Sequence, residues 1–315
     1  MELLKLKDYK GIKIKKNKLE VSKDEIKKAL EHLQNSRAKT ITVNRPAKQG
    51  DSIEIDFEVK QGNVKIEGGE SKNHPLILGQ GKFLPGFEKE MEEMKANEVK
   101  EFSLKAPDDW PDKKVAGKAL DFKVKMNLVQ ERDLPKIDDK FAESLGEFKT
   151  LKDLEKSIEH GIMQEKGQKE QQRIRMELIE KIADDSKVDI PEKAIDQEVD
   201  KMEKEFNFSI QNMGLDMETY LKQIKTDIND LKKTWRIEAE KRIKMTLCLD
   251  EIAERENIKV DDQEVEEKVN QDLKQYPNVE EVKKNIDLEQ LKEYTKNVLR
   301  NQRVFELLEK EAKII

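Results

Sequence analysis

Residues 78–88 read Leu-Gly-Gln-Gly-Lys-Phe-Leu-Pro-Gly-Phe-Glu, and this stretch decides the fold of the first half of the chain. Its pair of glycines, Gly79-Gln80-Gly81, superficially resembles a glycine-rich phosphate loop. Apolar residues at helical spacing begin where the loop ends, at Phe87, Met91 and Met94, and Asn97 can adopt the left-handed conformation of a turn. The loop does not match a phosphate-binding loop, because the Lys-Ser/Thr ending of that motif is absent. The stretch therefore leads into one predicted short helix, which the turn at Asn97 closes.

Three runs of alternating apolar and polar residues surround this loop. The apolar positions are Ile53, Ile55, Phe57 and Val59 in the first run, Phe102, Leu104 and Ala106 in the second, and Leu120, Phe122, Val124, Met126 and Leu128 in the third. A period of two is typical of a strand with one buried face. The segment from 45 to about 132 is therefore predicted to be a small antiparallel β-sheet packed on one short helix.

From residue 136 onward the apolar period is helical almost to the end. The first stripe contains Leu151, Leu154 and Ile158 and continues to Ile182, and the second contains Ile195, Val199, Met202 and Phe206, with Pro191 in the first turn of its helix. The third contains Leu221, Ile224, Ile228, Leu231 and Trp235 and continues to Ile252. A last helix is predicted from about Leu288 to Ala312. Breaks fall at Met213-Gly214-Leu215, at Asn257 and at Pro277. These breaks interrupt the heptad too often for a coiled-coil rod, so the pattern predicts a body of long antiparallel helical hairpins.

The first 44 residues contain little apolar material. Ile12-Lys13-Ile14 alternates briefly, and Ser22 with Glu25 forms a capping box that predicts a helix carrying Ile26, Leu30 and Leu33 on one face. This piece is too poor in apolar residues to fold alone, so we expect it to pack on the C-terminal helices. The predicted organisation is α+β and multidomain: a linker strand and helix over 1–44, a sheet domain over 45–133 inserted in an elongated all-α body, and that body over 134–315.

The charge of the chain argues against nucleic acid as its main partner. The net charge is −6 with an isoelectric point near 5.6, although residues 1–50 carry 14 Lys or Arg against 6 Asp or Glu. That basic start either contacts RNA or an acidic partner, or forms a solvated face. No aromatic residues interleave with its lysines, which favours the solvated face.

Several chemistries are also excluded. The only cysteine, Cys248, rules out a disulfide framework and fits a reducing compartment, and its apolar neighbours indicate a buried residue. The histidines His32, His74 and His160 show no metal-ligand spacing, so we expect no metal and no cofactor. Neither a membrane span nor a signal peptide is apparent, so the sequence predicts a cytoplasmic protein without a membrane partner.

Five separated pieces of the sheet domain, in their order and spacing, carry a specific resemblance. They are Ile66-Glu67-Gly68-Gly69, the loop 78–88, Met94–Glu98, Ala106–Trp110 and Val115–Lys118. Over residues 46–130 this order resembles the FKBP-type peptidyl-prolyl isomerase family. Further segments are similar to trigger factors. They are the junction Gln130–Pro135 with Asp138–Phe141, the later segments Gly214-Leu215, Glu238–Arg242 and Leu249–Ala253, and the start Asp8–Ile12. The resemblance to trigger factors thus covers nearly the whole chain.

The resemblance implies an ATP-independent molecular chaperone that binds unfolded or nascent polypeptides and isomerises X–Pro bonds. It places the catalytic pocket at Phe57, Ile66, Glu67, Phe83, Leu84, Phe87, Trp110, Val115 and Phe122. Phe87 would be the floor, Glu67 the acidic wall, and the indole N–H of Trp110 a donor to a substrate carbonyl. Ile66 and His74 stand where the family has aromatic residues, which implies reduced activity.

One departure from trigger factors concerns the ribosome. Their docking signature, Gly-Phe-Arg-x-Gly-Lys, occurs nowhere in this chain, so docking at the ribosome is not expected of it. An RNA- or ribosome-bound factor that uses the basic start is an alternative interpretation, and strongly salt-dependent binding would identify it.

In the helical body, large apolar residues gather near a predicted hairpin tip, where little can be buried. They are Met202, Phe206, Phe208, Ile210, Met213 and Leu215. Exposed apolar surface there, with adaptable methionine, predicts a binding surface for unfolded chains. The alternative is a helical scaffold or adaptor whose FKBP-like module is inactive and only binds a peptide.

Overall fold

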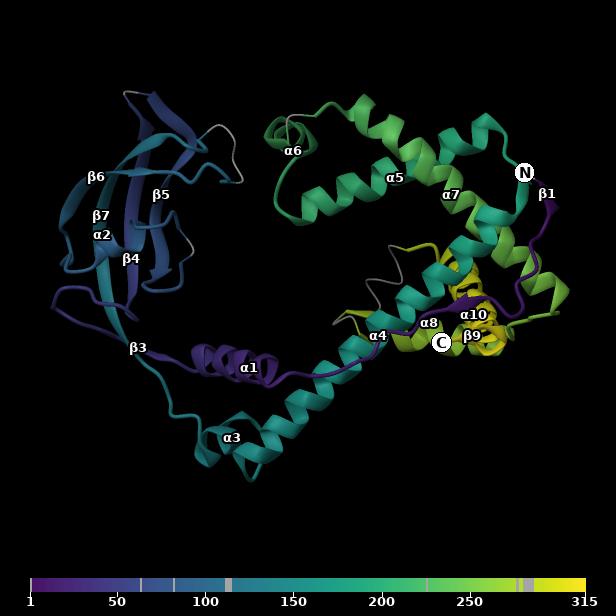
Figure 1. The fold of residues 1–315 in the computed structure, drawn as a ribbon, viewed down its shortest axis with the longest axis horizontal. Coiled ribbons are helices and arrows are strands. Elements are labelled where there is room, and N and C mark those ends of the chain that lie inside the picture. Colours follow the sequence, from purple (N-terminus) through teal and green to yellow (C-terminus); the bar gives the residue numbers. More distant parts are fainter. Residues whose placement is uncertain are drawn as a thin grey trace. The chain divides into compact units, whose positions relative to one another are not determined.

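The computed structural model describes residues 2–62, 64–81, 83–110, 115–224, 226–275, 278–279 and 286–315. The chain forms two compact units, one from residues 1–20 with 163–315 and the other from residues 21–162 (Figure 1). Each unit has its own hydrophobic cores, and the long helix α4 (Leu151–Asp185) contributes residues to both. The predicted combination of a β-sheet domain with a helical body is confirmed.

The unit 21–162 contains an antiparallel sheet of five strands. These are β3 (Lys39–Thr42), β4 (Ser52–Gln61), β5 (Val64–Ile77), β6 (Val99–Lys105) and β7 (Ala119–Asp133). The order is β3-β7-β4-β5, and β6 pairs with the first half of β7. Along β7 the side chains from Leu120 to Met126 alternate between buried and more exposed, as the period of two predicts.

One short helix, α2 (Phe87–Met91), packs its buried residues Phe87 and Met91 into the core of this sheet. Gly86 precedes it at φ 92°, a left-handed conformation that suits glycine, and a Cβ at Gly86 would lie only 3.3 Å from Leu104 Cδ2. After the helix, Glu93 and Asn97 also have positive φ, so the predicted turn at Asn97 is confirmed. The glycine-rich loop and this turn therefore bound the helix on both sides.

The same unit has a second, helical core. It is built by α1 (Lys23–Ser36), α3 (Asp139–Leu145) and the first turns of α4, and its buried residues are Leu30, Phe141, Ala142 and Leu154. The capping box at the start of α1 is confirmed, because the Ser22 hydroxyl accepts from Glu25 N while the Glu25 carboxylate accepts from Ser22 N. Ile26 and Leu33 pack against this core from the face of α1 that the spacing predicts.

The unit 1–20 with 163–315 is mostly helical. Besides the later part of α4 it contains α5 (Glu192–Asn212), α6 (Met217–Ile224), α7 (Ile228–Arg255), α8 (Asp262–Leu273) and α10 (Leu288–Glu311). Helix α5 packs on α7 around Val199, Met202 and Ala239, and α8 packs on α10. No helix in the described part of the chain has the length and apolarity that a membrane crossing requires.

Some predicted helix ends differ from the structure. The stripe from Leu221 to Ile252, predicted as one helix, belongs to two, because the Asp227 carboxylate accepts from Asn229 N and starts α7 afresh. Pro191 caps α5 in an extended conformation and does not lie in its first turn. The breaks at Met213 and Asn257 are confirmed, whereas Pro277 lies outside the described residues.

The N-terminal segment contributes two short strands to this unit. Strand β1 (Glu2–Lys5) pairs antiparallel with β8 (Lys187–Asp189), and β2 (Lys13–Ile14) pairs parallel with β9 (Lys313–Ile314). Leu6, Tyr9 and Ile14 are buried in one core with residues of α4, α7 and α10. The Tyr9 hydroxyl donates to Glu256 Oε1 at 2.6 Å, and burial with this hydrogen bond raises the pKa of Tyr9 to about 12.

Candidate functional site

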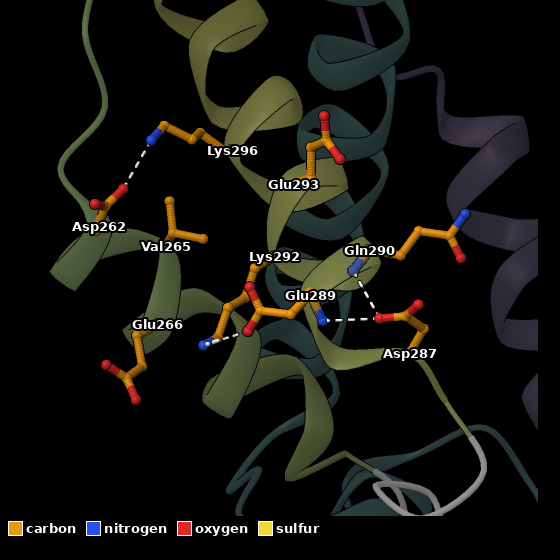
Figure 2. A pocket seen from close by; sticks show the side chains of 9 residues that line it. All are labelled: Asp262, Val265, Glu266, Asp287, Glu289, Gln290, Lys292, Glu293 and Lys296. Atoms are coloured by element: carbon orange, nitrogen blue, oxygen red, sulfur yellow. Dashed lines mark hydrogen bonds and ion pairs between the residues drawn. The ribbon is translucent and has the colours of Figure 1, made fainter.

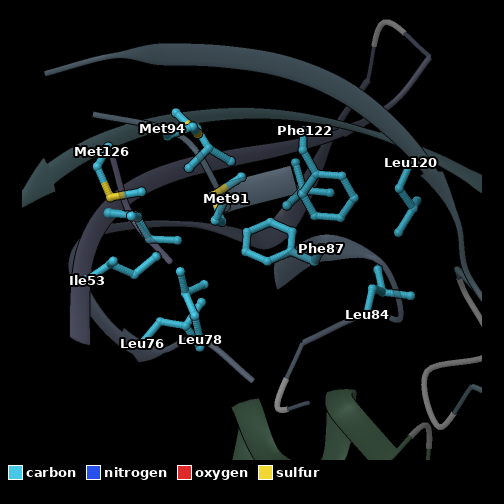
Figure 3. Packing of buried hydrophobic residues seen from close by; sticks show 14 of the residues in the cluster. Ile53, Leu76, Leu78, Leu84, Phe87, Met91, Met94, Leu120, Phe122 and Met126 are labelled. Atoms are coloured by element: carbon cyan, nitrogen blue, oxygen red, sulfur yellow. The ribbon is translucent and has the colours of Figure 1, made fainter. Parts of the chain in front are cut away.

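The residues predicted to line the catalytic pocket share one cluster with the core of the β-sheet domain. Phe87 lies at its centre and is fully buried, with the buried residues Phe122 and Leu84 nearby (Figure 3). Val115 of the same cluster is also buried. Phe57, Ile66, Phe83 and Trp110 pack against them and remain partly exposed. The structure thus brings together the eight predicted apolar residues, while the side chain of Glu67 lies outside the described residues.

Several aromatic rings of this cluster contact Phe87. Phe83 stacks on Phe87 with ring centroids 4.3 Å apart and planes 17° apart. Phe102 and Phe122 approach Phe87 at 5.6 and 5.2 Å. The ring predicted to be the pocket floor is therefore covered by Phe83 in this structure.

A second set of rings surrounds Phe83. Phe57, His74 and Phe83 form a triangle in which each pair of centroids is 5.5 Å apart and each contact is edge to face. His74 comes from β5 and Phe57 from its partner strand β4, next to a register shift between Ile55 and Phe57. Sequence reasoning noted His74 only as a departure from the family pattern, and it gave no signal that the imidazole would contact both phenyl rings.

Trp110 stands at the end of a tight turn. Its backbone N–H donates to Pro107 O at 3.1 Å, and the N–H of Gly117 donates to the same oxygen at 3.1 Å. Gly117 has φ 71°, a left-handed conformation that favours glycine in this turn. Among the described residues none accepts a hydrogen bond from the Trp110 indole, which leaves this donor available.

A buried ion pair supports the start of the glycine-rich loop. Asp51 is 2% exposed and accepts from Arg45 Nη1 at 2.6 Å and Nη2 at 3.0 Å, as well as from Lys48 N. Burial alone would raise the pKa of Asp51, but the hydrogen bonds from Arg45 and Lys48 outweigh it and lower the pKa. The Asp51 carbonyl accepts from Leu78 N at 3.0 Å. The Arg45–Asp51 ion pair therefore holds in place the residue to which the first residue of the loop is hydrogen-bonded. The sequence pattern did not single out Arg45 or Asp51.

The predicted client-binding residues near the end of α5 do not share one environment. Phe208 and Met213 are 65% and 67% exposed, whereas Met202 and Ile210 are buried. Phe206 is half-buried between Tyr220 of α6 and Trp235 of α7, and Leu215 is half-buried in the following turn. Met202 therefore belongs to the core between α5 and α7, and Ile210 is a buried residue near the end of α5. Phe208 and Met213 provide the exposed apolar surface.

Two known protein families match parts of the chain. "FKBP-type peptidyl-prolyl cis-trans isomerase" matches residues 43–127, and "Bacterial trigger factor protein (TF) C-terminus" matches residues 150–310. The trigger factor of Caldicellulosiruptor saccharolyticus is 32% identical over 311 residues, which are 98% of this chain and 71% of that protein. The chain belongs to the trigger factor family.

Other members show a similar degree of relatedness. The trigger factor of Carboxydothermus hydrogenoformans is 35% identical over 284 residues, which are 89% of this chain and 66% of that protein. A solved structure from work on promiscuous substrate recognition by the trigger factor chaperone aligns with a TM-score of 0.48 at 20% identity and covers 94% of this chain and 70% of its own. As a trigger factor, this chain is a molecular chaperone with peptidyl-prolyl isomerase activity, and the alternative of a scaffold with an inactive module is not favoured.

The helical part of this trigger factor also has a hollow of about 870 Å³ between α8 and α10 (Figure 2). Carboxylates and lysines make up most of its wall, and Lys296 and Lys292 pair there with Asp262 and Glu289. Asp287 accepts from the backbone N–H groups of Glu289 and Gln290 and so caps α10. In the described part of the chain no group of His, Cys, Asp or Glu side chains is placed to hold a metal ion. Of the carboxylates in this hollow, Asp287 therefore caps a helix, and Asp262 and Glu289 form ion pairs.

Proposed function

We propose that the aromatic cluster around Phe87 is the isomerase pocket of this trigger factor. An X–Pro amide rotates slowly because rotation breaks the resonance of its C–N bond, with a barrier of about 18–20 kcal/mol. A pocket that binds the twisted amide more tightly than the planar one lowers this barrier without covalent chemistry. The residues required are apolar walls and a donor for the carbonyl, and the cluster supplies both kinds.

The observation that best supports this proposal is that partly exposed apolar side chains pack on a buried aromatic ring. Phe57, Ile66, Phe83 and Trp110 are partly exposed and pack on the buried Phe87, so the cluster presents apolar side chains to a ligand. The indole N–H of Trp110, which has no acceptor among the described residues, would donate to the substrate carbonyl. Leu84, Val115 and Phe122 would complete the walls, with Glu67 as the acidic wall. We further propose that activity is reduced, because Ile66 and His74 replace aromatic residues.

Unfolded or nascent polypeptides are the proposed partners of the helical part, and Phe208 with Met213 is the proposed contact surface. We propose no cofactor, a cytoplasmic location and a division of the chain at 1–44, 45–133 and 134–315, with the isomerase domain inserted in the helical body.

Replacing Trp110 tests the pocket. Trp110→Ala removes the donor and one wall, so kcat/KM on a short X–Pro peptide should fall at least about tenfold. Trp110→Phe keeps a ring and removes the N–H, so a smaller loss of about twofold to tenfold is expected. Tyr294→Ala, which removes a 66% exposed aromatic residue of α10, is the matched control and should leave turnover unchanged.

The measurement is a peptide isomerisation assay, together with circular dichroism and thermal unfolding of each variant. A folded Trp110→Ala protein with the turnover of the parent chain would show that the pocket lies elsewhere.

A further inference from the structure

Phe87, the ring on which the proposed pocket depends, has no exposed surface in the free chain. Phe102 and Phe122 contact it from β6 and β7, and both belong to strands of the sheet. Phe83 covers it by parallel stacking at 4.3 Å and comes from the loop between β5 and α2. Among these neighbours, only Phe83 is attached to a segment outside the sheet.

The backbone around Phe83 is anchored at both ends of the loop. Gly79, Gly81 and Gly86 have positive φ, which gives the loop its shape. Leu78 N donates to Asp51 O before Phe83, and Phe87 N donates to Leu84 O after it. The Leu84 side chain is buried beside Phe83, while Phe83 itself is partly exposed. The ring of Phe83 can therefore leave Phe87 by rotation of its side chain, without loss of these anchors.

Edge-to-face contacts hold the Phe83 ring in its covering position. Phe57 and His74 each approach it at 5.5 Å, with planes at 89° and 83°. Such contacts are favourable but weak, so they set a preferred position that a ligand can displace. The covered state is thus the preferred state of the free chain and is open to competition.

We propose that Phe83 is a specificity-determining cover of the proline subsite, whose ring occupies the position over Phe87 that a prolyl ring must take. This inference rests on the proposed isomerase pocket. A substrate binds only when the phenyl ring has moved aside, so the apparent affinity is reduced by the fraction of chains that are uncovered. The cover acts on the free protein and not on the twisted amide, so it raises KM and leaves kcat unchanged.

Phe83→Val tests the cover, because valine keeps an apolar wall and is too small to stack over Phe87. KM for a short X–Pro peptide should fall by about twofold to tenfold, the factor that corresponds to one stacked aromatic pair, with kcat within about twofold of the parent. Phe83→Trp supplies a larger cover and should raise KM. It also keeps the test decisive if the valine variant does not fold.

Two further measurements separate a cover from a structural role. Phe102→Val removes a phenyl ring that contacts the same Phe87 from β6, and it should not lower KM. In a Trp235→Phe background, Trp110 is the only tryptophan, so its fluorescence reports peptide binding directly. The dissociation constant measured in this way should fall with Phe83→Val by the same factor as KM.

The outcomes distinguish this inference from the proposed function. An unchanged or raised KM in folded Phe83→Val, with an active parent chain and an inactive Trp110→Ala, would overturn the cover and leave the pocket intact. A parent chain without activity on the peptide would instead overturn the pocket.

Discussion

Polar replacement of Phe208 and Met213 should weaken the binding of unfolded chains without destabilising the fold. Both side chains are about two-thirds exposed, so they contribute little to the core of α5 and α7. Serine at both positions removes the exposed apolar surface at the end of α5 and changes no charge. The double variant Phe208→Ser, Met213→Ser therefore isolates the proposed client surface.

The expected loss can be worked out from the exposed area. An aromatic side chain buries about 150–250 Å² when fully covered, so 65% exposure leaves about 100 Å² or more of Phe208 available to a client. At about 25 cal/mol per Å², a client that covers half of this area gains about 1.2 kcal/mol, and Met213 contributes a similar amount. Because binding also costs side-chain order, we expect affinity to fall by about fivefold to thirtyfold.

The assay is fluorescence anisotropy of a labelled, permanently unfolded polypeptide, with light scattering of an aggregating client as a second measure. Val64→Ser is the matched control, because Val64 is 71% exposed but lies on β5 of the isomerase sheet. Ile210→Ala shows the opposite behaviour: Ile210 is 1% exposed, so its truncation should cost about 2–5 kcal/mol of stability. A folded double serine variant that binds the client as tightly as the parent would refute the assignment of this surface.

Two further predictions follow from the fold. Lys39 lies opposite Asp133 in the β3–β7 ladder, so a short Gly/Ser bridge can replace residues 40–132. This deletion should leave a helical protein that unfolds cooperatively. Loss of cooperative unfolding on heating would count against the insertion of the isomerase domain in the helical body. The hydrogen bonds from Arg173 and Asn17 lower the pKa of Glu170 from 4.5 to about 2, so the stability this carboxylate adds is complete above about pH 4.5 and is lost as the pH falls toward 2. Glu170→Gln should therefore lower the melting temperature at pH 7, and the difference from the parent should vanish across that acidic window. A difference that stays constant with pH would contradict this account.

The fold was predictable where local pattern and tertiary environment agree. The alternation in β4, β6 and β7 and the capping box of α1 required no knowledge of distant residues. Strand β5 was not predicted, because Gly68, Gly69, Asn73 at φ 52° and Pro75 interrupt its alternation, and its pairing with β4 maintains it as a strand. The split between α6 and α7 was missed because the apolar stripe continues across it, although Asp227 is a cap signal that the sequence contains.

For the site, motif order identified residues that share a cluster but not their positions within it. The stacking of Phe83 on Phe87 depends on its side-chain rotamer, which contacts from Phe57 and His74 on other strands influence. At the end of α5 the signal was available. Ile210 continues the stripe of Val199, Met202 and Phe206, whereas Phe208 lies about 200° around the helix from Ile210 and so faces away from the core.

The parallel pairing of β2 with β9 imposes an order on folding during synthesis. Lys13 pairs with Lys313, so β2 cannot pair until a segment 300 residues further along the chain has been made. At about 5–20 residues per second, that wait is roughly 15–60 s. The isomerase sheet draws only on residues 39–133 and can form long before, since its contacts are completed as soon as β7 has emerged. This chaperone can therefore form its isomerase sheet while β2 still lacks its partner strand β9. In that interval Ile14, which is buried in the complete chain, is an apolar residue of an unpaired segment, the kind of segment that a chaperone binds.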